Sequence, residues 1–106
     1  MRQAYDCGRV ALGKEPCKIV ADGTLGCKDE DELLDLFRMM ASGDREAYMQ
    51  AATVSLATQQ CDVFTRGTEV FVEDTKVFSD TAYIRPKGQV SKYWVSRLAL
   101  WDREES

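Results

Sequence analysis

The sequence contains no histidine among its 106 residues. This absence excludes catalytic triads and dyads built on an imidazole base, and it excludes every zinc site that needs an imidazole ligand. No glycine-rich phosphate-binding loop is present either. Only two prolines and seven glycines occur, and 44% of the residues are hydrophobic, so the chain is neither a low-complexity linker nor a disordered segment. We expect one small domain without enzymatic activity, cofactor or metal ion.

Long apolar runs are also missing, since no stretch approaches the roughly 18 residues that a membrane-spanning helix needs. Positive charge is not in excess, because 14 lysines and arginines face 18 aspartates and glutamates, for a net charge of −4. This balance argues against a dedicated nucleic-acid or anionic-membrane binder. The acidic residues gather in 29–35, whereas no acidic residue lies between Asp80 and Asp102. We therefore expect one acidic and one basic region of the surface.

Two helices are predicted between Asp29 and Gln60. Asp29 and the carboxylates after it suit the N-terminus of a helix, and leucines, Phe37 and Met40 follow at helical spacing. Gly43 is typical of the residue that ends a helix, and Asp44 is a typical N-cap for a second helical pattern that runs to about Gln60. Capping explains the acidic cluster better than cation binding does. Together these signals predict a helical hairpin.

The four cysteines Cys7, Cys17, Cys27 and Cys61 contain no C-x-x-C pair. Two disulfides are the favoured interpretation, with buried free thiols or a four-thiolate zinc site as alternatives. Cys27 precedes the first predicted helix and Cys61 follows the second. Helices of about 14 and 17 residues span about 21 and 25 Å, so an antiparallel hairpin would bring these two sulfurs together. We predict Cys27–Cys61 and, by elimination, Cys7–Cys17.

After Cys61 the composition shifts toward valine, phenylalanine, threonine and tyrosine. Strands are predicted at 68–73, 77–78, 81–85 and 92–96, and 98–101 is left open as a last strand or a helical turn. This spacing fits a small closed or nearly closed antiparallel barrel. We expect an α+β fold in a single domain: an extended arm (1–26) with a short hairpin or paired extended segments in 8–21, the helical hairpin (27–61), the barrel (62–101) and a polar tail (102–106).

Three motifs resemble the strands of bacterial SH3-like (SH3b) domains: Gly67-Thr-Glu-Val-Phe-Val, Ala82-Tyr-Ile-Arg with Gly88 after it, and Tyr93-Trp-Val. The arrangement from Gly26-Cys27 through Gly43-Asp44 to Cys61 is also similar to small exported proteobacterial proteins with a helical hairpin ahead of such a barrel. The sequence departs from typical SH3b domains in its N-terminal cysteine arm. The resemblance implies a binding module of the cell envelope with an SH3-like barrel and no catalytic residues.

Aromatic and basic side chains concentrate in the C-terminal part of the chain. We predict a binding face for a protein or a peptidic cell-wall component, because aromatic rings beside cations recognise peptides and sugars. Strand alternation places Tyr93 and Trp94 on opposite faces, and Trp94 is expected in the core. The predicted binding residues are Tyr83, Arg85, Lys87, Lys92, Tyr93, Arg97 and Trp101.

The favoured function is a non-enzymatic binding module of the bacterial envelope or secreted space, held together by disulfides. The first ten residues contain no apolar segment of the kind found in signal peptides, so periplasmic or secreted location assumes a leader outside this sequence. The alternative is a cytoplasmic regulator or inhibitor with reduced cysteines, acting on a protein or a nucleic acid. The interpretation of the hairpin as a DNA-binding helix-turn-helix is disfavoured. Its second helix carries a single basic residue, Arg45, which is too little positive charge to neutralise DNA phosphates.

Overall fold

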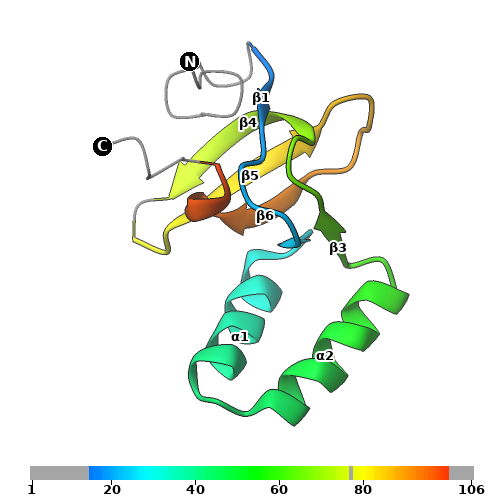
Figure 1. Cartoon of the computed structure of the whole chain (residues 1–106), viewed down its shortest axis with the longest axis vertical. Helices are drawn as coiled ribbons and strands as arrows, with labels where there is room; N and C mark the ends of the chain where they lie inside the picture. Colours follow the sequence, from blue (N-terminus) through cyan, green and yellow to red (C-terminus); the bar gives the residue numbers. More distant parts are fainter. Residues whose placement is uncertain (1–14, 77, 101–106) are drawn as a thin grey trace.

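The computed structural model describes residues 15–76 and 78–100, which form an α+β domain with one antiparallel sheet and two helices (Figure 1). The strands lie in the order β1-β4-β5-β6-β2-β3, and every pair of neighbours is antiparallel. The elements are β1 (Cys17–Lys18), β2 (Thr24–Cys27), α1 (Glu30–Ala41), α2 (Arg45–Ala57), β3 (Cys61–Phe64), β4 (Glu69–Lys76), β5 (Thr81–Pro86), β6 (Tyr93–Ser96) and a final 3-10 turn (Arg97–Ala99).

The helical hairpin is confirmed, and it begins where the caps predicted. The Asp29 carboxylate accepts a hydrogen bond from the Asp31 amide at 3.3 Å, and the Asp44 carboxylate accepts one from the Ala47 amide at 3.1 Å. Gly43 joins the helices with φ +82°, a conformation that favours glycine. The second helix ends at Ala57, three residues before the predicted end, and Gln59 has φ +64° there.

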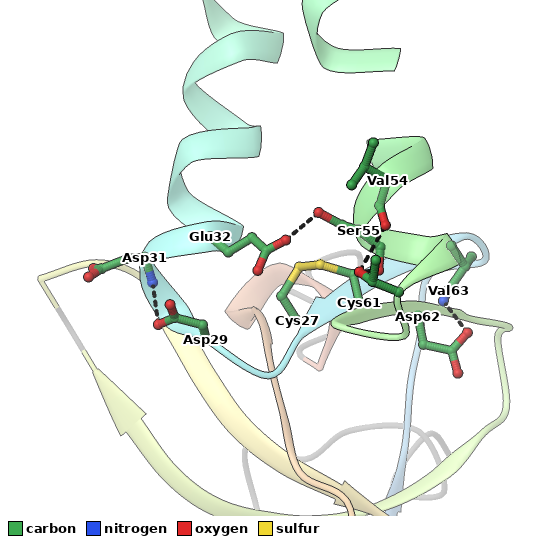
Figure 2. The surroundings of a disulfide bond; sticks show 10 residues. Cys27, Asp29, Asp31, Glu32, Val54, Ser55, Cys61, Asp62 and Val63 are labelled. Atoms are coloured by element: carbon green, nitrogen blue, oxygen red, sulfur yellow. Dashed lines mark hydrogen bonds between the residues drawn. A yellow bond between two sulfur atoms is a disulfide. The ribbon is translucent and has the colours of Figure 1, made fainter. Parts of the chain in front are cut away.

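The predicted Cys27–Cys61 disulfide is present, and it bridges two paired strands (Figure 2). Cys27 and Cys61 lie directly opposite each other in β2 and β3, so the helical hairpin is an insertion between two neighbouring strands. Both cysteines are buried in a small core with Leu33, Leu36 and Ala52. No described cysteine is free. Cys17 is 2% exposed, whereas Cys7 lies outside the described residues, so Cys7–Cys17 stays a prediction.

The main core lies against the inner face of the curved sheet. It is built from alternate residues of β4, β5 and β6, together with Phe64, whose ring meets that of Tyr93 edge-on at 5.2 Å. Gly26 of β2 is closely covered, since a Cβ there would lie 2.8 Å from Phe64 and 3.0 Å from Val95. The glycine therefore lets these two side chains reach the backbone. The other members are Cys17, Ile19, Val70, Val72, Ala82, Ile84, Ala99 and Leu100.

The expected barrel is not closed. Strands β1 and β3 are the two edges of the sheet, and no ladder joins them within the described residues. β1 has only two residues, too few to pair with a further strand along its length. The backbone after β1 nevertheless links the segments that flank β4 and β6, because the Val20 amide donates to the Ala99 carbonyl at 2.8 Å and the Ile19 amide to the Thr68 carbonyl at 3.0 Å. The result is an open six-stranded sheet.

Further boundaries differ from the predictions. Residues 24–26, assigned to the arm, and Cys27, assigned to the helical hairpin, together form strand β2 inside the sheet. Phe78, expected to begin a strand, lies in a turn and is fully exposed, because the chain reverses there between β4 and β5. The open choice at the C-terminus resolves as the 3-10 turn after β6. Residues 1–14, 77 and 101–106 fall outside the described part of the chain, so the first half of the extended segments predicted in 8–21 and the polar tail stay predictions. No helix in the described part is long and apolar enough to cross a membrane.

Candidate aromatic–cation face

The outer surface of the central strands carries aromatic and charged side chains. In β5 and β6, buried residues alternate with half-buried ones, so the side chains between the core positions point away from the core. Tyr83 and Arg85 reach this surface from β5, and Trp94 reaches it from β6. We name the group the aromatic–cation face, and its residues are Phe71, Glu73, Lys76, Tyr83, Arg85, Lys92 and Trp94.

A stacked ring pair occupies the middle of the aromatic–cation face. Tyr83 and Trp94 are directly opposite each other in β5 and β6. Their ring centroids are 4.6 Å apart, and the planes are inclined by 27°. Trp94 is half-buried because it also packs against the cluster around Cys27. The helical core therefore supports one side of the ring pair, and the pair itself is partly open to solvent.

Three cations lie over rings of the aromatic–cation face, two of them over the stacked pair and one over Phe71. The Lys92 ammonium is 6.0 Å from the centroid of Tyr83, and the Lys76 ammonium is 5.0 Å from that of Trp94. The Arg85 guanidinium lies 4.8 Å from the Phe71 ring, its neighbour across β4 and β5. Such contacts are worth about 0.5–1 kcal/mol each at exposed sites. They hold the long basic side chains against the face.

Glu73 enters the aromatic–cation face at an irregularity in β4. The register shifts between Val72 and Asp74, so Glu73 is the extra residue of a β-bulge, a feature that redirects side chains. Its carboxylate oxygens lie 3.6 Å from Arg85 Nε and 3.6 Å from Lys92 Nζ. One carboxylate is thus shared between two cations.

The other end of the face is tied to the first turn of α1. Glu30 accepts hydrogen bonds from Lys76 Nζ at 2.9 Å, Ser79 Oγ at 2.7 Å and Thr81 Oγ1 at 2.8 Å. The bond from Lys76, with smaller contributions from the two hydroxyls, holds the pKa of the Glu30 carboxyl below its ordinary value although partial burial acts against this. The same bond raises the pKa of Lys76. Glu30 therefore fixes the lysine that lies over Trp94.

The predicted binding residues divide into three groups. Tyr83, Arg85 and Lys92 come together on the aromatic–cation face. Tyr93 does not: it is 7% exposed and packs in the core, because its side of β6 faces Phe64. This corrects its assignment as an exposed binding residue. Trp94, expected in the core, lies on the opposite side of β6, where it is half-buried against the cluster around Cys27 and not part of the main core.

The remaining predicted residues lie elsewhere. Lys87 pairs with Glu69 at 3.3 Å and lines a shallow polar pocket with Lys18 and Thr68. Arg97 pairs with Asp80 at 3.4 Å beside the turn between β4 and β5. Trp101 is outside the described residues. Sequence reasoning missed Phe71, Glu73 and Lys76, although the alternation of Val70 and Val72 already placed Phe71 on the opposite side of β4.

A second surface lies at the tip of the helical hairpin. Met40 and Met49 are 51% and 57% exposed, and they line an apolar hollow with Gly43, Arg45 and Tyr48. Charged side chains near it have both signs, and the exposed Arg38 pairs with Asp35. This hollow is lined mainly by apolar groups, and it carries few groups that would orient a ligand.

No protein-family model, curated protein or solved structure matches this chain. Among residues 15–76 and 78–100, no three histidine, cysteine, aspartate or glutamate side chains gather so as to hold a metal ion. The aromatic–cation face offers ring surfaces, N–H donors and a fixed carboxylate, which are groups that bind a ligand.

Proposed function

We propose that the protein is a non-enzymatic binding module that recognises a protein or peptide through the aromatic–cation face. The observation that carries the proposal is the stacked pair of Tyr83 and Trp94 with lysines 76 and 92 over its rings. Aromatic residues and arginine are enriched at the centres of protein interfaces, where they bury large areas with little loss of side-chain entropy. The face is also rigid, because its cations are held by Glu30 and Glu73.

We further propose an SH3-like relationship and a location in the bacterial envelope or the secreted space. The consecutive antiparallel strands β4, β5 and β6 agree with the strand sequence of SH3-like domains, although the sheet is open. The Cys27–Cys61 disulfide weakly supports an oxidising compartment. An intact mass measured after alkylation without reductant, on protein from its native host, tests the location. No added alkyl groups supports it, and four added groups supports the cytoplasmic alternative.

The binding proposal is tested with two probes: purified cell-wall sacculi and a displayed library of random octapeptides. Wild-type protein should retain one of them, and Tyr83→Ala should reduce that retention about tenfold or more, since the variant removes half of the ring pair. Val63→Ala is the matched control, because Val63 is 47% exposed at the edge strand β3, away from the ring pair. Equal retention by Tyr83→Ala, or no retention of either probe by the wild type, would overturn the proposal.

A further inference from the structure

The charges on the aromatic–cation face are distributed unevenly along it. At one end, Lys76 has the Glu30 carboxylate at 2.9 Å, and the negative charges of Asp74 and Asp31 also act on it. At the other end, Arg85 and Lys92 share only Glu73, which is the one carboxylate within 4.0 Å of either among the described residues. The Lys76 end is therefore neutralised, and the Arg85 end keeps a surplus positive charge.

The donors at the Arg85 end are oriented but only partly used. Arg85 lies against Phe71 and donates from Nη1 to the Gln89 carbonyl at 3.1 Å, so its guanidinium is fixed in place. The contacts of Arg85 Nε and Lys92 Nζ with Glu73 are both 3.6 Å, which is longer than a hydrogen bond. The side chains of Lys92 and Arg85 are 40% and 32% exposed. A carboxylate arriving from outside can therefore receive hydrogen bonds from both without breaking any in the protein.

The ring pair lies directly beside these donors. The Lys92 ammonium is over Tyr83, and Tyr83 stacks on Trp94. A ligand that places a carboxylate between Arg85 and Lys92 would bring its next side chain onto the partly exposed rings. The face thus combines one anion-binding subsite, made by Arg85 and Lys92, with a neighbouring apolar subsite, made by Tyr83 and Trp94.

From this arrangement we infer that the partner is an acidic peptide segment, with an aspartate or glutamate bound by Arg85 and Lys92 and an adjacent apolar residue on Tyr83 and Trp94. The inference rests on the proposed binding function and names its ligand class. Charge complementarity selects this ligand, because a basic segment would meet the surplus positive charge and a neutral segment would leave the two donors without an anionic acceptor.

The test is to sequence the octapeptides that the protein selects from the displayed random library and to compare their amino-acid composition with that of the library. We expect enrichment of aspartate or glutamate next to an aromatic or aliphatic residue. Arg85→Gln with Lys92→Gln should weaken binding of synthetic copies of these peptides about tenfold or more, since hydrogen bonds to charged groups are lost. Replacing the acidic residue of the peptide with its amide should weaken binding to the wild-type protein by a similar factor. Added salt should weaken the binding of the acidic peptide more than the binding of its amide variant.

A charge-matched control is Lys28→Gln with Lys87→Gln, which removes two positive charges outside the aromatic–cation face. This double variant should bind the selected peptides as the wild type does. Selection of neutral or basic peptides would overturn the inference and leave the binding function standing. Equal weakening by both double variants, or no effect of Arg85→Gln with Lys92→Gln, would also overturn it. The absence of any selected peptide would overturn the inference, and sacculi retention sensitive to Tyr83→Ala would then show that the binding function itself stands.

Discussion

Lys76 and Glu30 connect the helical hairpin to the outer face of the sheet. The Lys76 ammonium lies 2.9 Å from a carboxylate oxygen of Glu30, the first residue of α1, and 5.0 Å from the centre of the Trp94 ring. The side chain of Glu30 is only 15% exposed, and two hydroxyl groups also donate to it. One carboxylate therefore joins α1, the turn between β4 and β5, and the lysine on the ring pair.

We expect Glu30→Gln to lower the free energy of unfolding at pH 7 by about 1–2 kcal/mol, because a neutral amide accepts weaker hydrogen bonds than a carboxylate. Since the pKa of Glu30 lies below its ordinary value in the folded protein, its stabilisation is complete above the unfolded pKa, close to 4.5, and is lost as the pH falls through the folded pKa. Urea unfolding at pH 7 and pH 3 should show a smaller pH dependence in Glu30→Gln than in the wild type. The exposed Glu46→Gln serves as control; an equal change there would contradict this role of Glu30.

The opposite orientations of the two tyrosines predict different stability losses. Tyr93→Ala removes a core ring that meets Phe64, and we expect a loss of about 3–5 kcal/mol. Tyr83→Ala removes a half-buried ring from the stack with Trp94, so a loss of about 1 kcal/mol is expected. Thermal and urea unfolding of both variants measure this difference. Similar losses for the two would show that Tyr83 supports the fold as strongly as Tyr93 does.

Gly26 is expected to tolerate no side chain. A methyl group there would contact the Phe64 ring and Val95, and Gly26→Ala should cost about 1–3 kcal/mol of unfolding free energy. Phe64→Leu removes the ring atom that lies 2.8 Å from the added methyl group. In urea unfolding, the loss for the double variant should therefore be smaller than the sum of the two single losses. Strict additivity would mean that Phe64 is not the obstacle.

The Cys27–Cys61 bridge is expected to stabilise the domain by about 3–4 kcal/mol, because it closes a loop of 34 residues in the unfolded chain. Cys27→Ala with Cys61→Ala should show this loss in urea unfolding while the far-ultraviolet circular dichroism at low denaturant stays close to that of the wild type. A double variant as stable as the wild type would show that the bridge adds no constraint to the unfolded state.

Local signals made the helical hairpin predictable. Asp29, Asp44 and Gly43 specify helix ends within a few residues, so their effect can be read without knowing the rest of the fold. Strand β2 was missed because Thr24–Cys27 is short, contains Gly26 and follows a turn-like Asp-Gly pair. β2 pairs with β3, which follows it in the sequence only after both helices of the hairpin, and a local sequence pattern does not indicate so distant a partner.

The candidate site was predictable only in part for a similar reason. Alternation showed that Tyr93 and Trp94 point to opposite sides, but the inward side depends on Phe64 and on the space above Gly26, which belong to other strands. Glu73 reaches Arg85 and Lys92 through a bulge that interrupts the alternation of β4. Whether the sheet closes into a barrel likewise depends on the length of the edge strands β1 and β3, and the spacing of strands along the sequence does not give that length.

The position of the Cys27–Cys61 bridge means that one cut within the helical hairpin would leave the chain covalently joined. A protease that cuts the turn at Gly43 would divide the polypeptide into two pieces, each with one of the two cysteines. The pieces would remain one covalent molecule, and the bridge would keep β2 of the first piece beside β3 of the second. Separation would require a second chemical event, reduction of a bond whose sulfurs belong to residues only 0% and 2% exposed.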